Sequence, residues 1–147
     1  SRLIITSSAG RLNSSSTPQL LAKSPAIKPA FTKPAGKFWY RRYALFSRFD
    51  SGIQLDEESW YSVTPELAAA HIATRLAAGA QGGPNAYGRL WVDAFAGAGG
   101  SAIQLALHDP TGLVLAVDID PRKVAMACHN AKLYGVAKQI EFIVGDF

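Results

Sequence analysis

The sequence predicts an α/β fold with a parallel β-sheet, and two kinds of observation support this prediction. Three apolar runs, at residues 90–92, 113–117 and 140–144, have the length and composition of buried strands. Helix-like segments at residues 101–107 and 121–134 separate these runs. Strands that alternate with helices are typical of a parallel sheet with crossover helices. The strands are therefore expected to end at one common edge of a doubly wound sheet.

A glycine-rich turn joins the first predicted strand to the first predicted helix. Gly97 and Gly99 allow the backbone to turn tightly and to approach a ligand closely. The start of the following helix offers free N–H groups and a positive dipole end. Asp93, at the end of the strand, would repel a pyrophosphate and attract a cation. This favours S-adenosylmethionine, which carries an ammonium and a sulfonium group, over a dinucleotide.

Two further acidic residues follow the second and third predicted strands. Asp118 stands 21 residues after Gly97, the spacing of a carboxylate that binds ribose hydroxyls. Asp146 and its neighbour Phe147 suit the edge and the face of an adenine ring. With these residues we group Ala94 and Ile119, which follow the first two acids directly. The pattern predicts a cofactor site along the carboxyl edge of the sheet.

Charge is distributed unevenly along the 147 residues. Residues 1–49 contain nine Lys or Arg and no Asp or Glu, whereas the remainder contains six basic and eleven acidic residues. A basic first part suggests contact with a polyanion such as RNA, and a solvated tail is the alternative for residues 1–36. The single cysteine, Cys128, excludes an internal disulfide and is expected in the core. No apolar run reaches the roughly 20 residues that span a membrane.

The chain divides into three predicted parts. Residues 1–36 are rich in Ser, Pro and Lys and are expected to be disordered, although an organelle transit peptide has a similar composition. Residues 37–80 form a helical extension, in which Thr64, Pro65 and Glu66 begin a helix that runs to about residue 78. Residues 88–147 hold the first half of the α/β domain, so we expect a longer protein that continues beyond residue 147.

Aromatic and basic residues are concentrated at residues 37–46. Trp39, Tyr43 and Phe46 would share one face of a helix, so they are expected to pack on the main domain or to cover a nucleotide. No Cys or acidic residue stands at metal-ligand spacing from His71 or from the other two histidines, so no metal site is predicted.

Several segments from about residue 37 onward point to one kind of enzyme. The glycine-rich segment VDAFAGAGG (residues 92–100) alone indicates a methyltransferase. The segments LFSRFD (residues 45–50) and SVTPE (residues 62–66) are more specific, because generic methyltransferases lack them. With the segments DIDP (residues 118–121) and IEFIVGDF (residues 140–147), the chain resembles the trimethylguanosine synthases, which hypermethylate RNA caps.

This resemblance implies a Rossmann-like fold of which the chain carries the first three strands, with a small helical extension that closes the cofactor site. It implies two successive methyl transfers from S-adenosylmethionine to N2 of a 7-methylguanosine cap. Phe46 and Thr64 fall on positions that approach the cofactor, and Lys37 and Asn130 on positions that contact the cap. Capped small nuclear and small nucleolar RNA are the implied partners, and the nucleus is the implied location.

One departure from the family concerns the acceptor site. The family's Ser-Pro-Pro-Trp-like segment, whose tryptophan stacks on the cap, would lie beyond Phe147. No catalytic residue is therefore assigned, and the 147-residue piece is expected to have little activity. Three alternatives stay open: another RNA guanine-N2 methyltransferase, an NAD-dependent oxidoreductase, for which residues 97–102 fit the pattern G-x-G-x-x-A, and a non-catalytic RNA-binding fragment.

Overall fold

The computed structural model describes residues 38–79 and 88–147, and they contain a three-stranded parallel sheet. The strands are β1 (Leu90–Asp93), β2 (Leu113–Asp118) and β3 (Ile140–Val144), in the order β1-β2-β3. Their register places Asp93 opposite Ala116 and Asp118 opposite Val144. The predicted strands and their parallel arrangement are confirmed. The prediction for residues 1–36 lies outside the described residues, and so does Lys37.

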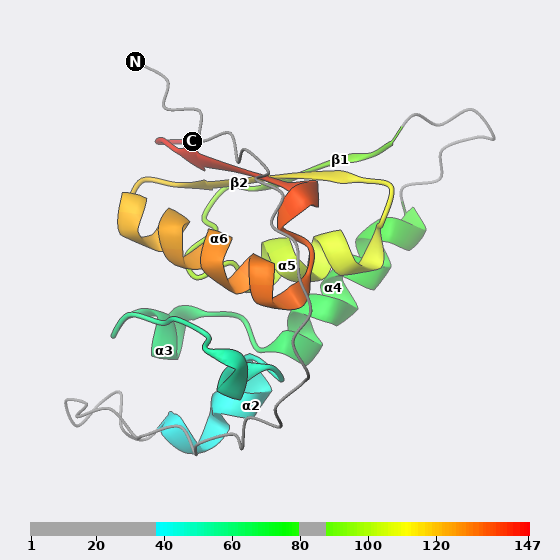
Figure 1. Ribbon diagram of the computed structural model, residues 1–147. Coiled ribbons are helices and arrows are strands. Elements are labelled where there is room, and N and C mark those ends of the chain that lie inside the picture. Colours follow the sequence, from blue (N-terminus) through cyan, green and yellow to red (C-terminus); the bar gives the residue numbers. More distant parts are fainter. Residues whose placement is uncertain (1–37, 80–87) are drawn as a thin grey trace, which may run out of the picture.

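The long helices lie on one face of the sheet (Figure 1). The crossover helices are α5 (Gly100–His108) and α6 (Pro121–Tyr134), and α4 (Glu66–Gly79) packs against α5. Right-handed crossovers between strands that are added in sequence order place both connecting helices on the same side. The predicted helices at residues 101–107 and 121–134 are confirmed, and so is the one that begins at Glu66.

Helix α6 shows why its ends could be recognised in the sequence. Its N-cap is Asp120, whose side chain accepts a hydrogen bond from the Arg122 N–H at 2.8 Å, and Pro121 occupies the first turn. Gly135 ends the helix with a φ of 78°, a left-handed conformation that favours glycine. The cysteine expected in the core, Cys128, is half-buried.

The first part of the described chain forms a small aromatic core on the side of the long helices away from the sheet (Figure 1). It comprises η1 (Trp39–Arg41), α2 (Arg42–Leu45), η2 (Phe49–Ser51) and α3 (Ser59–Ser62). The Trp39 ring lies 5.7 Å from Phe49 and 6.0 Å from Trp60, and all three side chains are buried. Residues 38–64 are called the extension below.

The single face expected for residues 39, 43 and 46 is only partly formed. Trp39 and Phe46 are buried, whereas Tyr43 is 47% exposed. The segment begins as a 3₁₀ helix, which has three residues per turn instead of 3.6, and this changes the direction of the later side chains. The Arg42 guanidinium lies over the rings of Trp39 and Tyr43, at 4.6 and 4.3 Å from their centres.

Glu66, the first residue of α4, links the extension to α6. One of its carboxylate oxygens, Oε2, accepts hydrogen bonds from the Ser47 N–H and the Tyr134 hydroxyl, both at 2.6 Å. The other accepts from the Ser47 hydroxyl at 2.8 Å. Burial, and then the bond to Glu66, raise the pKa of Tyr134 to about 12. The segments LFSRFD and SVTPE are therefore in direct contact, because Ser47 of one donates hydrogen bonds to Glu66 of the other.

Within the described ranges, no helix combines the length and the apolar character needed to cross a lipid bilayer.

Candidate cofactor site

A cavity of about 390 Å³ lies between the extension and the glycine-rich loop after β1. One wall belongs to the extension and includes Ser62 and Thr64, while the opposite wall includes Phe95, Gly97 and Asp118. Its volume lies in the range of small-molecule sites. The structure therefore brings together segments that are far apart in the sequence around one pocket.

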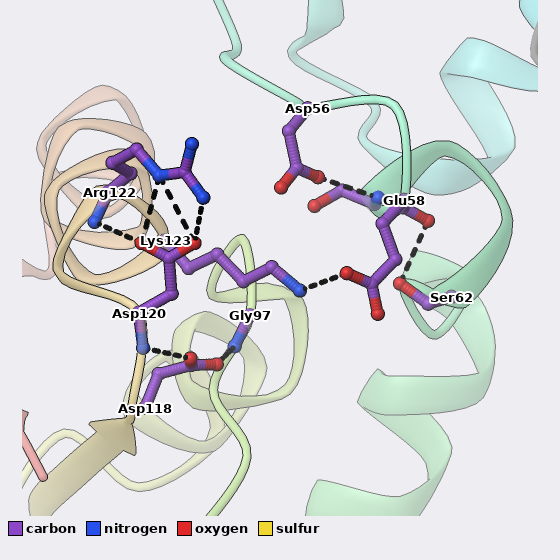
Figure 2. A network of polar contacts seen from close by, with 9 residues as sticks. Asp56, Glu58, Ser62, Gly97, Asp118, Asp120, Arg122 and Lys123 are labelled. Carbon is purple, nitrogen blue, oxygen red and sulfur yellow. Dashed lines mark hydrogen bonds and ion pairs between the residues drawn. The ribbon is translucent and has the colours of Figure 1, made fainter.

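Asp118 fixes the glycine-rich loop from the end of β2 (Figure 2). Its Oδ2 atom accepts a hydrogen bond from the Gly97 N–H at 2.9 Å, and its Oδ1 atom accepts one from the Asp120 N–H at 2.9 Å. Each carboxylate oxygen retains capacity for a second donor. The side chain is thus held in one orientation at the cavity, with acceptor positions left for hydroxyl groups.

Two glycines of the loop are required by close packing. Gly99 has a φ of 88°, and a Cβ atom there would lie 3.0 Å from the Ala127 Cβ of α6. A Cβ atom on Gly100 would lie 2.8 Å from the Val63 Cγ2 of the extension. The loop and the start of α5 therefore approach α6 on one side and the extension on the other so closely that a larger residue would force a neighbour to move.

Replacing Gly99 with alanine is expected to lower the free energy of unfolding by about 2 kcal/mol, because both the left-handed backbone and the contact with Ala127 become strained. The matched control is Gly97→Ala. Gly97 also has a positive φ, 51°, but nothing lies within 4 Å of the place that its Cβ atom would occupy, so only about 1 kcal/mol is expected. Urea unfolding of both variants measures the difference, and equal losses would contradict the packing argument.

Asp93 lies at the end of β1 beside the loop. Its Oδ2 atom is buried and has no hydrogen-bond partner among the described residues. Burial raises the pKa of the Asp93 carboxyl above its usual range; N–H groups of Phe95 and Ala102 offset part of this, and the charge of Asp118 adds to the rise. A buried carboxylate oxygen without a donor is a site that a cationic or hydrogen-bonding ligand would satisfy.

The other predicted cofactor residues occupy different depths. Thr64 lines the cavity, and Ala94 is half-buried next to Asp93. Ile119, Asp146 and Phe147 are exposed at the carboxyl edge of the sheet. Phe46 is not one of the described residues that line the cavity.

Phe46 instead supports the loop from behind. It is 1% exposed, its ring lies 6.2 Å from the ring of Tyr134, and its tip lies near Gly100. Direct contact of Phe46 with a cofactor stays a prediction, and the packing shown here makes it a support for the extension wall.

Asn130 is fully buried and links three segments. Its Oδ1 atom accepts a hydrogen bond from the Gln54 N–H at 2.8 Å, and its amino group donates to the carbonyls of Gln54 and Ala98, each at 2.9 Å. Both amino hydrogens are thereby used within the protein. The contact of Asn130 with a cap nucleotide, which the resemblance implies, stays a prediction.

Sequence reasoning missed several residues that line the cavity, among them Glu58 and Lys123. They form an ion pair of 2.6 Å although 65 positions separate them. No local pattern marks such a pair, because their proximity depends on how the extension folds against α6. Phe95 also lines the cavity and was missed. An aromatic residue in a loop with no predicted packing partner could have indicated a ligand contact, and Phe95 is 83% exposed.

Comparison with known proteins agrees with this geometry. Residues 88–147 match the family described as RNA cap guanine-N2 methyltransferase. The chain is 46% identical over 127 residues to the trimethylguanosine synthase of Schizosaccharomyces pombe, an alignment that covers 86% of this chain and 49% of that protein. It is 37% identical over 119 residues to the trimethylguanosine synthase of Saccharomyces cerevisiae, covering 80% of this chain and 36% of that protein.

The chain thus spans about half of the first relative's length and less of the second's. The first alignment covers 127 of the 147 residues, so at most 20 residues at the ends of the chain lie outside it. The extension is therefore part of the match. The family match at residues 88–147 contains the glycine-rich loop and Asp118, which the structure joins by the hydrogen bond to the Gly97 N–H. The chain therefore belongs to the RNA cap guanine-N2 methyltransferase family.

Proposed function

We propose that this chain binds S-adenosylmethionine in the cavity between the extension and the glycine-rich loop, as part of an enzyme that methylates N2 of a 7-methylguanosine RNA cap. Two successive transfers would give a 2,2,7-trimethylguanosine cap. S-Adenosylmethionine supplies a methyl group on a positively charged sulfur. The relatives named trimethylguanosine synthase support this choice of reaction.

The observation that carries the proposal is a pair of carboxylates at the ends of β1 and β2. Asp118 lines the cavity, whereas Asp93 lies beside the glycine-rich loop and is not among the described lining residues. Asp118 is held by two backbone N–H groups with acceptor positions left over, as binding of two ribose hydroxyls requires. Asp93 has a buried oxygen without a donor among the described residues, which suits the ammonium group of the cofactor. The residues present therefore fit a nucleoside that carries positive charge.

The remaining assignments follow from position. Gly97 and Thr64 would contact the cofactor from opposite walls of the cavity. The exposed Ile119 and Phe147 would lie on the adenine side, where Asp146 would accept from the exocyclic amine. Methyl transfer is an in-line displacement, so alignment of the two reactants and exclusion of water contribute most of the acceleration.

The acceptor is a capped RNA in this proposal. The proposed substrates are capped small nuclear and small nucleolar RNA, and the proposed location of the protein is the nucleus. The division into a basic segment at residues 1–36, a helical N-terminal part at 37–80 that includes the extension, and the α/β part at 88–147 belongs to the same proposal. An oxidoreductase is disfavoured, because Asp93 would stand beside the pyrophosphate of NAD with its carboxyl group buried.

Calorimetric titration of the 147-residue chain with S-adenosylhomocysteine and, separately, with NAD tests the cofactor assignment. We expect saturable binding of S-adenosylhomocysteine and no measurable binding of NAD. Binding of NAD alone would refute the proposal. The acceptor is tested in a protein that spans the full length of the relatives. Methylation of an RNA with a 7-methylguanosine cap is compared there with methylation of the same RNA carrying an unmethylated guanosine cap.

A further inference from the structure

An ion pair crosses the cavity from one wall to the other (Figure 2). The Lys123 Nζ of α6 lies 2.6 Å from the Glu58 Oε2 of the extension, and both residues line the cavity. The Lys123 side chain is 16% exposed and that of Glu58 is 56% exposed. The pair is thus partly shielded from water, and it connects the extension to α6 at the cavity.

The segment that carries Glu58 is held firmly at its two ends. At one end, Asn130 binds both the N–H and the carbonyl of Gln54. At the other end, Tyr134 and Ser47 bind the Glu66 carboxylate. The residues between these anchors supply the extension's share of the cavity lining: Glu58, Ser59, Ser62, Val63 and Thr64. The ion pair therefore restrains the part of the extension that lies between Gln54 and Glu66 and lines the cavity.

Lys123 also has carboxylates other than Glu58 nearby. The pKa of Lys123 is raised, chiefly by its hydrogen bond to Glu58, and the charges of Asp56 and Asp118 add to the rise. Asp56 accepts a hydrogen bond from the Ser59 N–H at 2.7 Å and is not among the described residues that line the cavity. Figure 2 shows the Lys123 side chain directed away from Asp118 and toward Glu58. Without Glu58, Asp118 would be the acid that remains among the described residues lining the cavity.

We propose that Glu58 and Lys123 are positioning residues for the cofactor: Glu58 holds the Lys123 ammonium away from the Asp118 carboxylate, and the pair holds the extension wall against α6. The inference rests on the proposed function, since the cavity must hold the cofactor. Its specific consequence is that removing Glu58 alone harms binding more than removing the pair, because a freed Lys123 competes with the ribose hydroxyls for Asp118.

A double-mutant cycle in the 147-residue chain tests this, with S-adenosylhomocysteine as the titrant. Lys123→Met is expected to raise the dissociation constant roughly threefold, as for loss of a partly exposed ion pair. Glu58→Gln is expected to raise it about tenfold, because it leaves a charged partner without its acid. The double variant should bind as Lys123→Met does, so that the second substitution rescues the first.

Arg122→Met is the matched control. Arg122 precedes Lys123 on α6 and forms an ion pair of 2.7 Å with Asp120, but its side chain is 87% exposed and does not line the cavity. This variant should bind as the unaltered chain does. Rescue by the second substitution is a result that loss of stability alone would not produce.

Two outcomes would overturn the inference: both single variants bind as the unaltered chain does, or the double variant binds no more tightly than Glu58→Gln. If the unaltered chain shows no binding of S-adenosylhomocysteine, the proposed function fails, and the inference fails with it. That result is distinguishable, because it appears before any substitution is made.

Discussion

Replacing Asp118 with alanine is expected to weaken binding of S-adenosylhomocysteine at least about 100-fold. Two hydrogen bonds from ribose hydroxyls to a carboxylate are worth roughly 1.5–3 kcal/mol each, and both would be lost. The substitution also releases the Gly97 and Asp120 N–H groups that the carboxylate binds at 2.9 Å. The loop would then have to be ordered by the cofactor itself, which lowers affinity further.

Calorimetric titration measures this loss, and Glu141→Gln is the control. Glu141 is a carboxylate exposed on β3, away from the cavity lining, so its removal should leave binding unchanged. Circular dichroism of the Asp118→Ala variant establishes that it is folded. A folded variant that binds within threefold of the unaltered chain would show that Asp118 does not bind the ribose.

The carboxyl edge of the sheet was predictable because its signals are local. Each strand is a short apolar run, and Asp93 and Asp118 are the last residues of β1 and β2, so parallel topology alone brings them to one edge. The helix ends at Pro121 and Gly135 depend on single residues whose backbone preferences are strong. For such features, a few neighbouring residues determine the structure.

The extension was less predictable because its contacts are long-range. Glu58 and Lys123 are brought together by packing of the extension on α6. The direction of Tyr43 depends on a 3₁₀ turn that hydrophobic periodicity does not reveal. Phe46 was recognised as part of a motif, but the motif does not distinguish a residue that contacts a ligand from one that packs behind Gly100. Sequence alone therefore identified the segment and not the role of each side chain.

Replacing Asn130 with alanine is expected to lower the free energy of unfolding by about 3 kcal/mol. The change removes three hydrogen bonds of 2.8–2.9 Å from a fully buried site and leaves the Ala98 carbonyl without that donor. It also frees the extension at Gln54, so binding of S-adenosylhomocysteine should weaken as well. Chemical denaturation and calorimetry measure the two effects.

Asn130→Asp separates the hydrogen bonds from the volume of the side chain. Aspartate has nearly the same shape, but it would direct a carboxylate oxygen at two carbonyl oxygens that now accept from the amide. It should therefore destabilise the chain at least as much as alanine does, unless it takes up a proton. Lys132→Ala, at an exposed position of the same helix, should have little effect.

The same variants also distinguish two roles for Asn130. If its main role is to contact a cap nucleotide, substitution would weaken binding of 7-methylguanosine triphosphate and leave unfolding and cofactor affinity unchanged. If it joins α6 to the extension and the glycine-rich loop, stability and cofactor affinity fall together in the absence of any cap. We expect the second result, because both amino hydrogens of Asn130 are already donated within the protein.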